Sequence, residues 1–471
     1  MLINKLKLCE GIMKLVVLGG GGVRSIFLAR ALVNGSEKIG VSEIVFMDTE
    51  EQKLEIFGRL SMATGKKMRP ELNFRLTTDI VDAVKGADYV ITTMRVGGDN
   101  ARIQDERVAL NLGVLGQETT GPGGFGMALR SVPALLKYCE IIKKYANPNV
   151  LIFNFTNPSG IVTQALRDAG YDNVYGICDA PSGFAGHLQH ILGVKSHEFE
   201  MRTYGLNHLS WFDEIKVRGE EVTEKLATDS KILEETHMGL FSPELIKMNG
   251  NVLLNEYLYF FFYREKAVDA IVTTGKTRGE TIQAINVELI EALSKIDIEN
   301  DTAKAFETFY KIYHKRDLSY MSIEANAKHS DWTLPTFEQF VSDKDEGGYA
   351  GVALDFIKGL STGGPHRLVL SVPNNGSING FDDSDVVEVT CVIDKTGVHP
   401  IKIGDVPKLQ LNLMKQVKYY ERNAVKAIQN RCKQTAIKAL MAHPLVSSYS
   451  IAKQLLEGYL EVHKEYVGEW K

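Results

Sequence analysis

The sequence lacks the features by which several large classes of protein are recognised. Its five cysteines are few for 471 residues, odd in number and without any short repeated spacing. They predict reduced thiols in a cytoplasmic protein and not a disulfide framework. No apolar run reaches the roughly 18 residues that a membrane span needs, and we expect neither a membrane segment nor a signal peptide.

An excess of positive charge is also missing. The net charge is −5, which argues against a nucleic-acid-binding protein because phosphate backbones select basic surfaces. A local basic pocket for a small anionic substrate is compatible with this balance. The length predicts two or three domains, which we place at residues 1–12 (a loose extension), 13–200 and 201–471.

A glycine-rich loop follows the first strand-like run. The apolar segment 14–18 leads directly into Gly19, Gly20, Gly21 and Gly22, and residues 26–33 are expected to form a helix. Strand, glycine loop and helix in this order are what a dinucleotide site requires. The next strand, at 43–47, ends at Asp48, a carboxylate that can accept from a ribose hydroxyl and favours NAD over NADP.

The loop alone leaves alternatives open. Its spacing is not the regular G-x-G-x-x-G, so a tight turn without a ligand would also explain it. Arg24, inside the loop, would contact a phosphate or point into solvent. Alternating strands and helices continue to about residue 200 and predict a parallel, Rossmann-like sheet with ligands at the carboxyl ends of its strands.

Several polar residues follow these strands and belong to the expected ligand edge. Arg95 comes directly after the strand at 89–94, with Arg102 one or two helical turns beyond. The polar, glycine-rich loop at 116–124 precedes a long helix and is a candidate anion site or active-site wall. Asn157 suits the recognition of hydroxyl groups, although an ordinary turn before Pro158 would explain it equally well.

Cys178 and His208 are the candidate metal ligands. Each follows an apolar, strand-like run, and together they would leave several coordination positions open for substrate oxygens. Taken singly, a buried cysteine or a hydrogen-bonded loop histidine is the simpler interpretation, and only their joint placement favours a metal. Asp179 would bind metal, act as an acid or cap the next helix.

These segments together are similar to a known family. The motifs Arg95-Val96-Gly97, Gly116-Gln117-Glu118-Thr119, Thr156-Asn157-Pro158, Cys178-Asp179-x-Pro181 and Gly205-Leu206-Asn207-His208 resemble glycoside hydrolase family four. The resemblance continues through Asn255 to Leu258, Thr277-Arg278 and Val372 to Gly376. It implies a lactate/malate dehydrogenase-type NAD-binding domain followed by an α+β domain that serves catalysis and oligomerisation.

The resemblance also implies the roles of single residues. Cys178 and His208 would hold a divalent metal, most often Mn²⁺, while Arg102, Asn157 and Arg278 would contact the phosphorylated sugar. Tyr257 matches the catalytic base, Glu118 a residue that supports this base, and Asp179 the proton donor of the 6-phospho-α-glucosidases. The family loop usually carries a serine and Thr-Pro after its third glycine, whereas this chain reads Gly22-Val23-Arg24-Ser25, so its pyrophosphate contacts are not carried over.

The implied activity is the hydrolysis of 6-phosphorylated glucosides or disaccharides with NAD and a divalent metal. The route is oxidation at C3, removal of the C2 proton, elimination, addition of water and reduction, and the family is an exception to the usual two-carboxylate mechanism. Asp179 favours 6-phospho-α-glucosidase over the alternative, 6-phospho-β-glucosidase. Family members are commonly dimers or tetramers, which implies a homo-oligomer.

Two alternatives of other kinds are a hydroxy-acid dehydrogenase and a catalytically silent NAD-binding regulator. The dehydrogenase would have no use for a Cys-His metal site or Tyr257, and the regulator would tolerate their loss. For the second half we expect long helices at 301–312, 410–441 and 447–466. Strands at 367–372 and 386–393 are expected to form a small antiparallel sheet.

Overall fold

The computed structural model describes residues 13–327, 333–344, 347–362 and 364–471. The expected extension at residues 1–12 lies outside these ranges. Within them, no helix is long and apolar enough to cross a membrane.

The first half forms the predicted parallel sheet, in the order β3-β2-β1-β4-β5-β6. Residues of β1 alternate between two cores: Leu15 and Val17 pack on one face, and Val16 and Leu18 on the other. A strand buried on both faces reads as a continuous apolar run, which is why its sequence shows no polar alternation. The parallel strands are β1 (Met13–Leu18), β2 (Val41–Met47), β3 (Asn73–Thr77), β4 (Tyr89–Thr92), β5 (Leu151–Asn154) and β6 (Val174–Ile177).

The two strands expected at 367–372 and 386–393 pair antiparallel, as predicted, and they form part of the larger sheet. β11 pairs antiparallel with β6, so the C-terminal strands continue the same sheet in the order β6-β11-β12-β7-β8-β10. Gly176 permits this contact, because a Cβ there would lie 2.6 Å from the Cβ of Ser371. The strands are β7 (Phe199–Leu206), β8 (Leu209–Val217), β9 (Glu220–Glu221), β10 (Leu253–Leu254), β11 (His366–Pro373), β12 (Val386–Asp394) and β13 (Gly397–Pro400).

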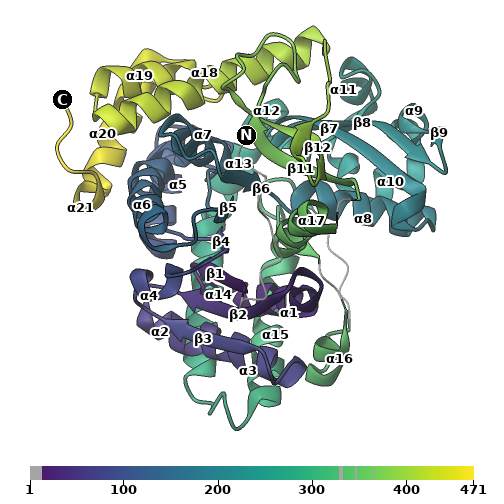
Figure 1. Ribbon diagram of the computed structural model, residues 1–471. Helices are drawn as coiled ribbons and strands as arrows, with labels where there is room; N and C mark the ends of the chain where they lie inside the picture. The colour runs from purple at the N-terminus through teal and green to yellow at the C-terminus, as the bar shows by residue number, and fades with distance from the viewer. Residues whose placement is uncertain (1–12, 328–332, 345–346, 363) are drawn as a thin grey trace.

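Helices cover both faces of the parallel half, as Figure 1 shows. A π-helical stretch, Leu54–Gly58, lies between α2 and α3. The helices of this half are α1 (Ser25–Ser36), α2 (Glu51–Lys53), α3 (Arg59–Met68), α4 (Ile80–Val84), α5 (Gly98–Leu110), α6 (Gly123–Tyr145), α7 (Ser159–Asp168) and α8 (Ala180–Leu192).

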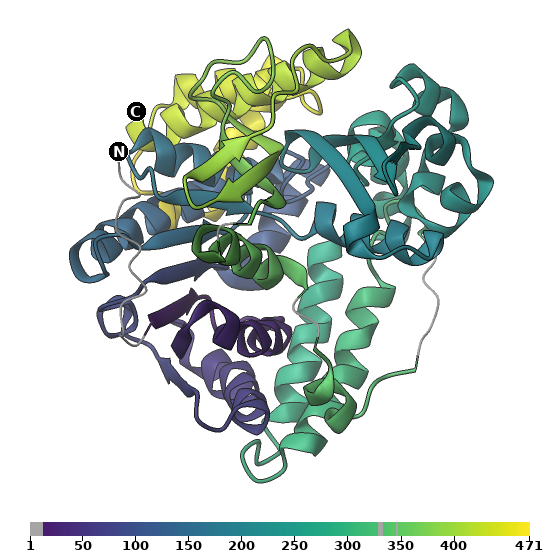
Figure 2. The same ribbon diagram turned by 45° about the vertical axis from the view of Figure 1, so that its right-hand side comes forward.

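Helices of the second half of the chain pack against the first half. α14 and α15 lie side by side and pack on α5 and α3, and Figure 2 shows this pair along the N-terminal half. The expected helix at 410–441 is two helices, because Arg431 has a φ of 49° and ends α18. The helices are α9 (Thr223–Thr228), α10 (Ser230–Glu235), α11 (Pro243–Met248), α12 (Leu258–Phe262), α13 (Arg264–Thr274), α14 (Arg278–Leu293), α15 (Thr302–Leu318), α16 (Phe337–Ser342), α17 (Gly348–Thr362), α18 (Lys408–Asn430), α19 (Lys433–Ala442), α20 (Tyr449–Val462) and α21 (Lys464–Val467).

Candidate active site

A cavity of about 1220 Å³ lies at the carboxyl ends of the parallel strands. Its wall includes residues that follow β1, β2, β4, β5 and β6, and others from α14 and α15. Ligand sites usually measure about 300–1,000 Å³, so this cavity has room for a dinucleotide and a sugar together. All predicted site residues line it except Gly20.

The glycine loop forms one wall of the cavity. Gly19 needs the absence of a side chain, since its φ is 103° and a Cβ would lie 2.6 Å from the carbonyl oxygen of Thr93. Gly20 instead packs on Phe46, where a Cβ would lie 2.5 Å from the Cβ of that residue. Asp48 accepts the backbone N–H of Gly21 at 3.0 Å. The loop, the start of α1 and this carboxylate therefore fit a dinucleotide.

Cys178 and His208 meet as expected, with Sγ and Nε2 3.6 Å apart. Cys178 directly follows β6, and His208 lies in the two-residue turn between β7 and β8, with a φ of 62°. Both side chains are buried. The tight hairpin thus holds the imidazole against the end of the parallel sheet.

The protonation of this pair follows from its burial. Burial lowers the pKa of His208 to about 4, so the imidazole is neutral at pH 7, as a metal ligand must be. Burial raises the pKa of the Cys178 thiol well above its usual value, although hydrogen bonds from the Ala180 backbone and the Asn207 side chain oppose this effect. A divalent cation would reverse it by binding the thiolate.

The fit to a metal is that of an open site. No group of three or more His, Cys, Asp or Glu side chains suited to a metal ion occurs among the residues the structure describes. Cys178 and His208 would therefore supply two ligands, and the remaining positions would fall to water or substrate oxygens. An imidazole and a thiolate suit the later first-row divalent metals.

Glu118 lies at the centre of a buried group of charges. It forms ion pairs with Arg95 and with Arg102, the latter at 3.3 Å, while Arg102 also donates to Glu106 at 2.8 Å. Burial alone would raise the pKa of Glu118, but the two arginines outweigh it and lower this pKa to about 2. Glu118 is therefore an anion at neutral pH.

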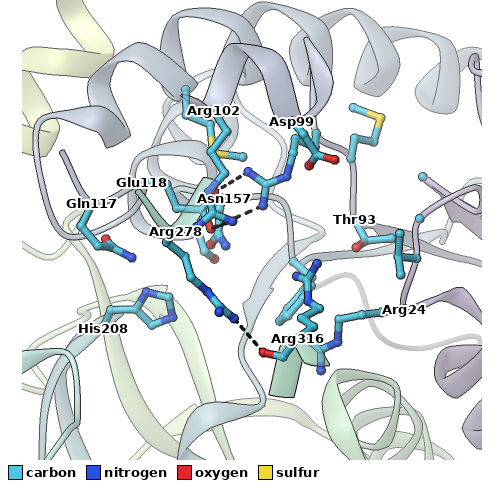
Figure 3. Close-up of a pocket in the computed structure, with 18 of the residues that line it drawn as sticks. Arg24, Thr93, Asp99, Arg102, Gln117, Glu118, Asn157, His208, Arg278 and Arg316 are labelled. Atoms are coloured by element: carbon cyan, nitrogen blue, oxygen red, sulfur yellow. Dashed lines mark hydrogen bonds and ion pairs between the residues drawn. The ribbon is translucent and has the colours of Figure 1, made fainter. Parts of the chain in front are cut away.

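Guanidinium groups reach into the cavity from several elements, and Figure 3 shows those of Arg24, Arg278 and Arg316. Arg278 begins α14 and donates to the carbonyl oxygen of Arg316 at 3.2 Å. Burial lowers the pKa of Arg316 to about 10, and the nearby arginines act in the same direction. Such a concentration of positive charge suits an anionic substrate group.

Arg316 was not expected from the sequence, although a signal exists. The buried face of α15 includes Phe309, Ile312 and Tyr313. The next position on this face, three or four residues further along, is Arg316. A cationic residue on an otherwise apolar helix face indicates a charge that is held inside the protein for a function.

Asp179 does not cap the next helix. It occupies the N-cap position of α8, but its side chain makes no capping hydrogen bond. Its carboxylate instead accepts from Arg24 at 2.9 Å. Arg24, whose side chain is also partly exposed to solvent, thus joins the glycine loop to Asp179.

Tyr257 lies over His208, with the ring planes 2° apart and the centroids 3.9 Å apart. Burial raises the pKa of its phenol above the ordinary value, and the charge of Glu256 adds to this. A hydrogen bond with Tyr320, whose hydroxyl donates to Glu256 at 2.6 Å, opposes the effect. As a base, Tyr257 therefore requires a cation beside it.

Family models match most of the chain. The family 4 glycosyl hydrolase model matches residues 14–194, and the model of the C-terminal domain of the same family matches residues 203–446. The chain belongs to glycosyl hydrolase family 4. The family inferred from the motifs is therefore confirmed.

Solved structures of family 4 are similar over nearly the whole length. The 6-phospho-β-glucosidase of Thermotoga maritima, solved with manganese, NAD⁺ and glucose 6-phosphate, is 29% identical, with a TM-score of 0.78 over 97% of this chain and 99% of its own. A 6-phospho-α-glucosidase from gut microorganisms, solved with NAD and glucose 6-phosphate, is 25% identical, with a TM-score of 0.79 over 98% and 100% of the two chains. Both anomeric types are thus similar to this family 4 chain.

A dehydrogenase shares only the fold. Lactate dehydrogenase from Eimeria maxima is 13% identical, with a TM-score of 0.50 over 90% of this chain and 97% of its own. This likeness confirms the predicted dehydrogenase-type fold. Membership of glycosyl hydrolase family 4 favours neither the hydroxy-acid dehydrogenase nor the silent regulator.

Proposed function

We propose that this family 4 enzyme hydrolyses 6-phosphorylated glucosides, with α-linked substrates preferred, and requires NAD⁺ and a divalent metal such as Mn²⁺. The observation that carries the proposal is the convergence of Cys178, His208, Tyr257 and Asp179 on the cavity that the glycine loop also lines. The solved relatives that hold NAD, manganese and glucose 6-phosphate support it.

The substrate phosphate would be bound by the positive side of the cavity. Arg278 carries charge that a phosphate dianion neutralises, Arg102 offers guanidinium donors, and Asn157 offers an amide to sugar or phosphate oxygens. Arg102 is already held by Glu106 and Glu118, so its position is set before substrate binds. This preorganisation lowers the cost of ordering the site.

Tyr257 would remove the proton from C2 of the sugar, and Glu118 would support it by fixing the arginines around the substrate. Gly19, Gly21, Gly22 and Asp48 would hold the dinucleotide. When bound, NAD⁺ supplies a reversible hydride acceptor and the metal, held by Cys178 and His208, a Lewis acid. The positive charge beside His208 would favour the phenolate of Tyr257.

Asp179 would protonate the departing oxygen of an α-linked substrate. It lines the cavity next to the metal ligand Cys178, and α8, which follows, fixes its backbone. Its carboxylate is paired with Arg24 in the structure, and it must take up a proton before it can donate one to the leaving group. A donor at this position is the feature that favours α-linked over β-linked 6-phosphoglucosides.

The experiment compares wild type and Asp179→Asn on methyl and p-nitrophenyl α-glucoside 6-phosphate. Methoxide needs a proton to leave and p-nitrophenolate does not. We expect the variant to lose roughly 10²- to 10⁴-fold in kcat on the methyl substrate and far less on the other. Equal losses of kcat on the two substrates would contradict the role of Asp179 as the acid. Faster cleavage of β-linked substrates by wild type would favour the 6-phospho-β-glucosidase alternative.

We also propose that the enzyme acts in the cytoplasm as a homo-oligomer, a dimer or tetramer. The free thiols of Cys139, Cys178, Cys391 and Cys432 support a reducing compartment. The oligomer rests on the family relationship, and light scattering of the purified protein tests it.

A further inference from the structure

We propose that Gln117 and Thr119 are positioning residues that fix the tautomer of His208, so that the lone pair of Nε2 faces Cys178 and the metal. The inference rests on the proposed role of His208 as a metal ligand. The two residues and the imidazole form a short chain of hydrogen bonds, and Figure 3 shows Gln117 beside His208 at the cavity wall.

The direction of this chain is set at Gln117. Its side-chain Oε1 accepts the backbone N–H of Thr119 at 2.7 Å and also the backbone N–H of Thr120. A backbone N–H can only donate. The atom that receives both must therefore be the carbonyl oxygen of the amide, and it cannot donate to any neighbour.

The hydroxyl of Thr119 is the next link. It lies 3.0 Å from Oε1 of Gln117 and 2.9 Å from Nδ1 of His208. A hydroxyl has one proton, and Oε1 offers none, so this proton is donated to Gln117. The Thr119 oxygen then accepts from Nδ1–H of His208. The opposite arrangement would place the lone pairs of two oxygens against each other at 3.0 Å.

The consequence falls on the other ring nitrogen. A neutral imidazole with its proton on Nδ1 carries a lone pair on Nε2, and Nε2 is the atom 3.6 Å from Sγ of Cys178. Tyr257 contacts the face of the ring and engages neither nitrogen in the plane. Partners of this kind orient metal-binding histidines and contribute to metal affinity.

The first test needs no substitution in the hydrogen-bond chain formed by Gln117, Thr119 and His208. Magic-angle-spinning NMR of metal-free enzyme labelled with [¹⁵N]histidine reports which nitrogen carries the proton, and the His208 signals are those absent from His208→Gln. We expect the proton on Nδ1 at neutral pH. A proton on Nε2 would overturn the proposal.

The second test measures Mn²⁺ affinity, by electron paramagnetic resonance of the free ion. Thr119→Val keeps the shape of the side chain and removes the hydroxyl, so we expect affinity to fall roughly 10- to 100-fold. Thr119→Ser restores the hydroxyl and should retain wild-type affinity. The matched control is Thr120→Val, since the buried Oγ1 of Thr120 has no hydrogen-bond partner in the part of the chain that the structure describes.

Unchanged Mn²⁺ affinity in Thr119→Val, or an equal loss of Mn²⁺ affinity in Thr120→Val, would contradict the proposed hydrogen-bond chain. Thermal unfolding of each variant establishes that it is folded. Should wild type itself bind no Mn²⁺, the proposed metal site fails. The tautomer of His208 in metal-free enzyme then tests the hydrogen-bond chain by itself. A proton on Nδ1 would support the chain, and a proton on Nε2 would contradict it.

Discussion

The imidazole of His208 and the phenol of Tyr257 stack face to face, with centroids 3.9 Å apart and planes 2° apart. This contact joins the proposed metal ligand to the proposed base. It places the phenol beside the point where a cation would bind between His208 and Cys178. A phenol that burial makes less acidic thereby gains a second positive neighbour, besides Arg278, when the metal is present.

The change Tyr257→Phe keeps the ring and its stacking on His208 but removes the base. We expect kcat to fall roughly 10²- to 10⁴-fold, and exchange of the C2 proton of substrate with D₂O, followed by NMR, to fall with it. Mn²⁺ affinity should stay the same. Tyr259→Phe, a buried tyrosine two residues further along the same segment, is the control, and an equal loss there would contradict the assignment.

The change Glu118→Gln removes the counter-ion of Arg95 and part of that of Arg102. We expect the free energy of unfolding at pH 7, from urea titration, to fall by about 2 kcal/mol. Because folding lowers the pKa of Glu118 from 4.5 to about 2, its contribution is present above pH 4.5 and is lost as the pH falls toward 2. Wild type and variant should therefore converge in acid.

Glu299→Gln is the control for this ion-pair effect, because the partner of Glu299, Arg59, lies on the surface. We expect a change below about 1 kcal/mol. A similar loss in both variants would show that the burial of Glu118 does not matter. A difference that persists unchanged to pH 2 would contradict the assigned ionisation.

The carboxyl group of Glu388 is expected to make stability depend on pH in the direction opposite to that of Glu118. This buried carboxylate accepts from Asn207 at 2.8 Å and from Ser210 at 3.3 Å. Burial raises its pKa from 4.5 to about 7 despite these donors. Between these two pH values the folded state holds a proton that the unfolded state has released, so stability falls as the pH rises.

Glu388→Gln stays neutral and should lack this decline. We compare the free energies of unfolding of variant and wild type by urea titration of metal-free enzyme. As the pH increases from 5 to 8, the free energy of the variant relative to wild type should rise by an amount on the order of 3 kcal/mol. Parallel curves for the two proteins would contradict the shifted pKa.

Local patterns made the parallel half of the fold predictable. The apolar run of β1, the glycines after it and Asp48 lie close together in sequence, and each constrains the backbone directly. The place of Cys178 and His208 followed from the same reasoning, because each ends a strand. Family motifs then supplied roles that composition and periodicity do not contain.

Contacts between distant segments were not predictable in this way. The pairing of β11 with β6 joins Ser371 to Gly176, and neither strand shows by itself which edge it meets. Arg431 interrupts a helical pattern without proline or glycine, through its left-handed backbone. The contact between Arg24 and Asp179 spans 155 residues, and only the folded chain brings it together.

The most direct measurement of the central claim is the release of p-nitrophenol from p-nitrophenyl α-glucoside 6-phosphate by enzyme stripped of metal and nucleotide, under reducing conditions that keep Cys178 a thiol. We predict no hydrolysis with NAD⁺ alone or Mn²⁺ alone, and full activity when both are restored. Hydrolysis at the same rate after both have been removed would contradict the account.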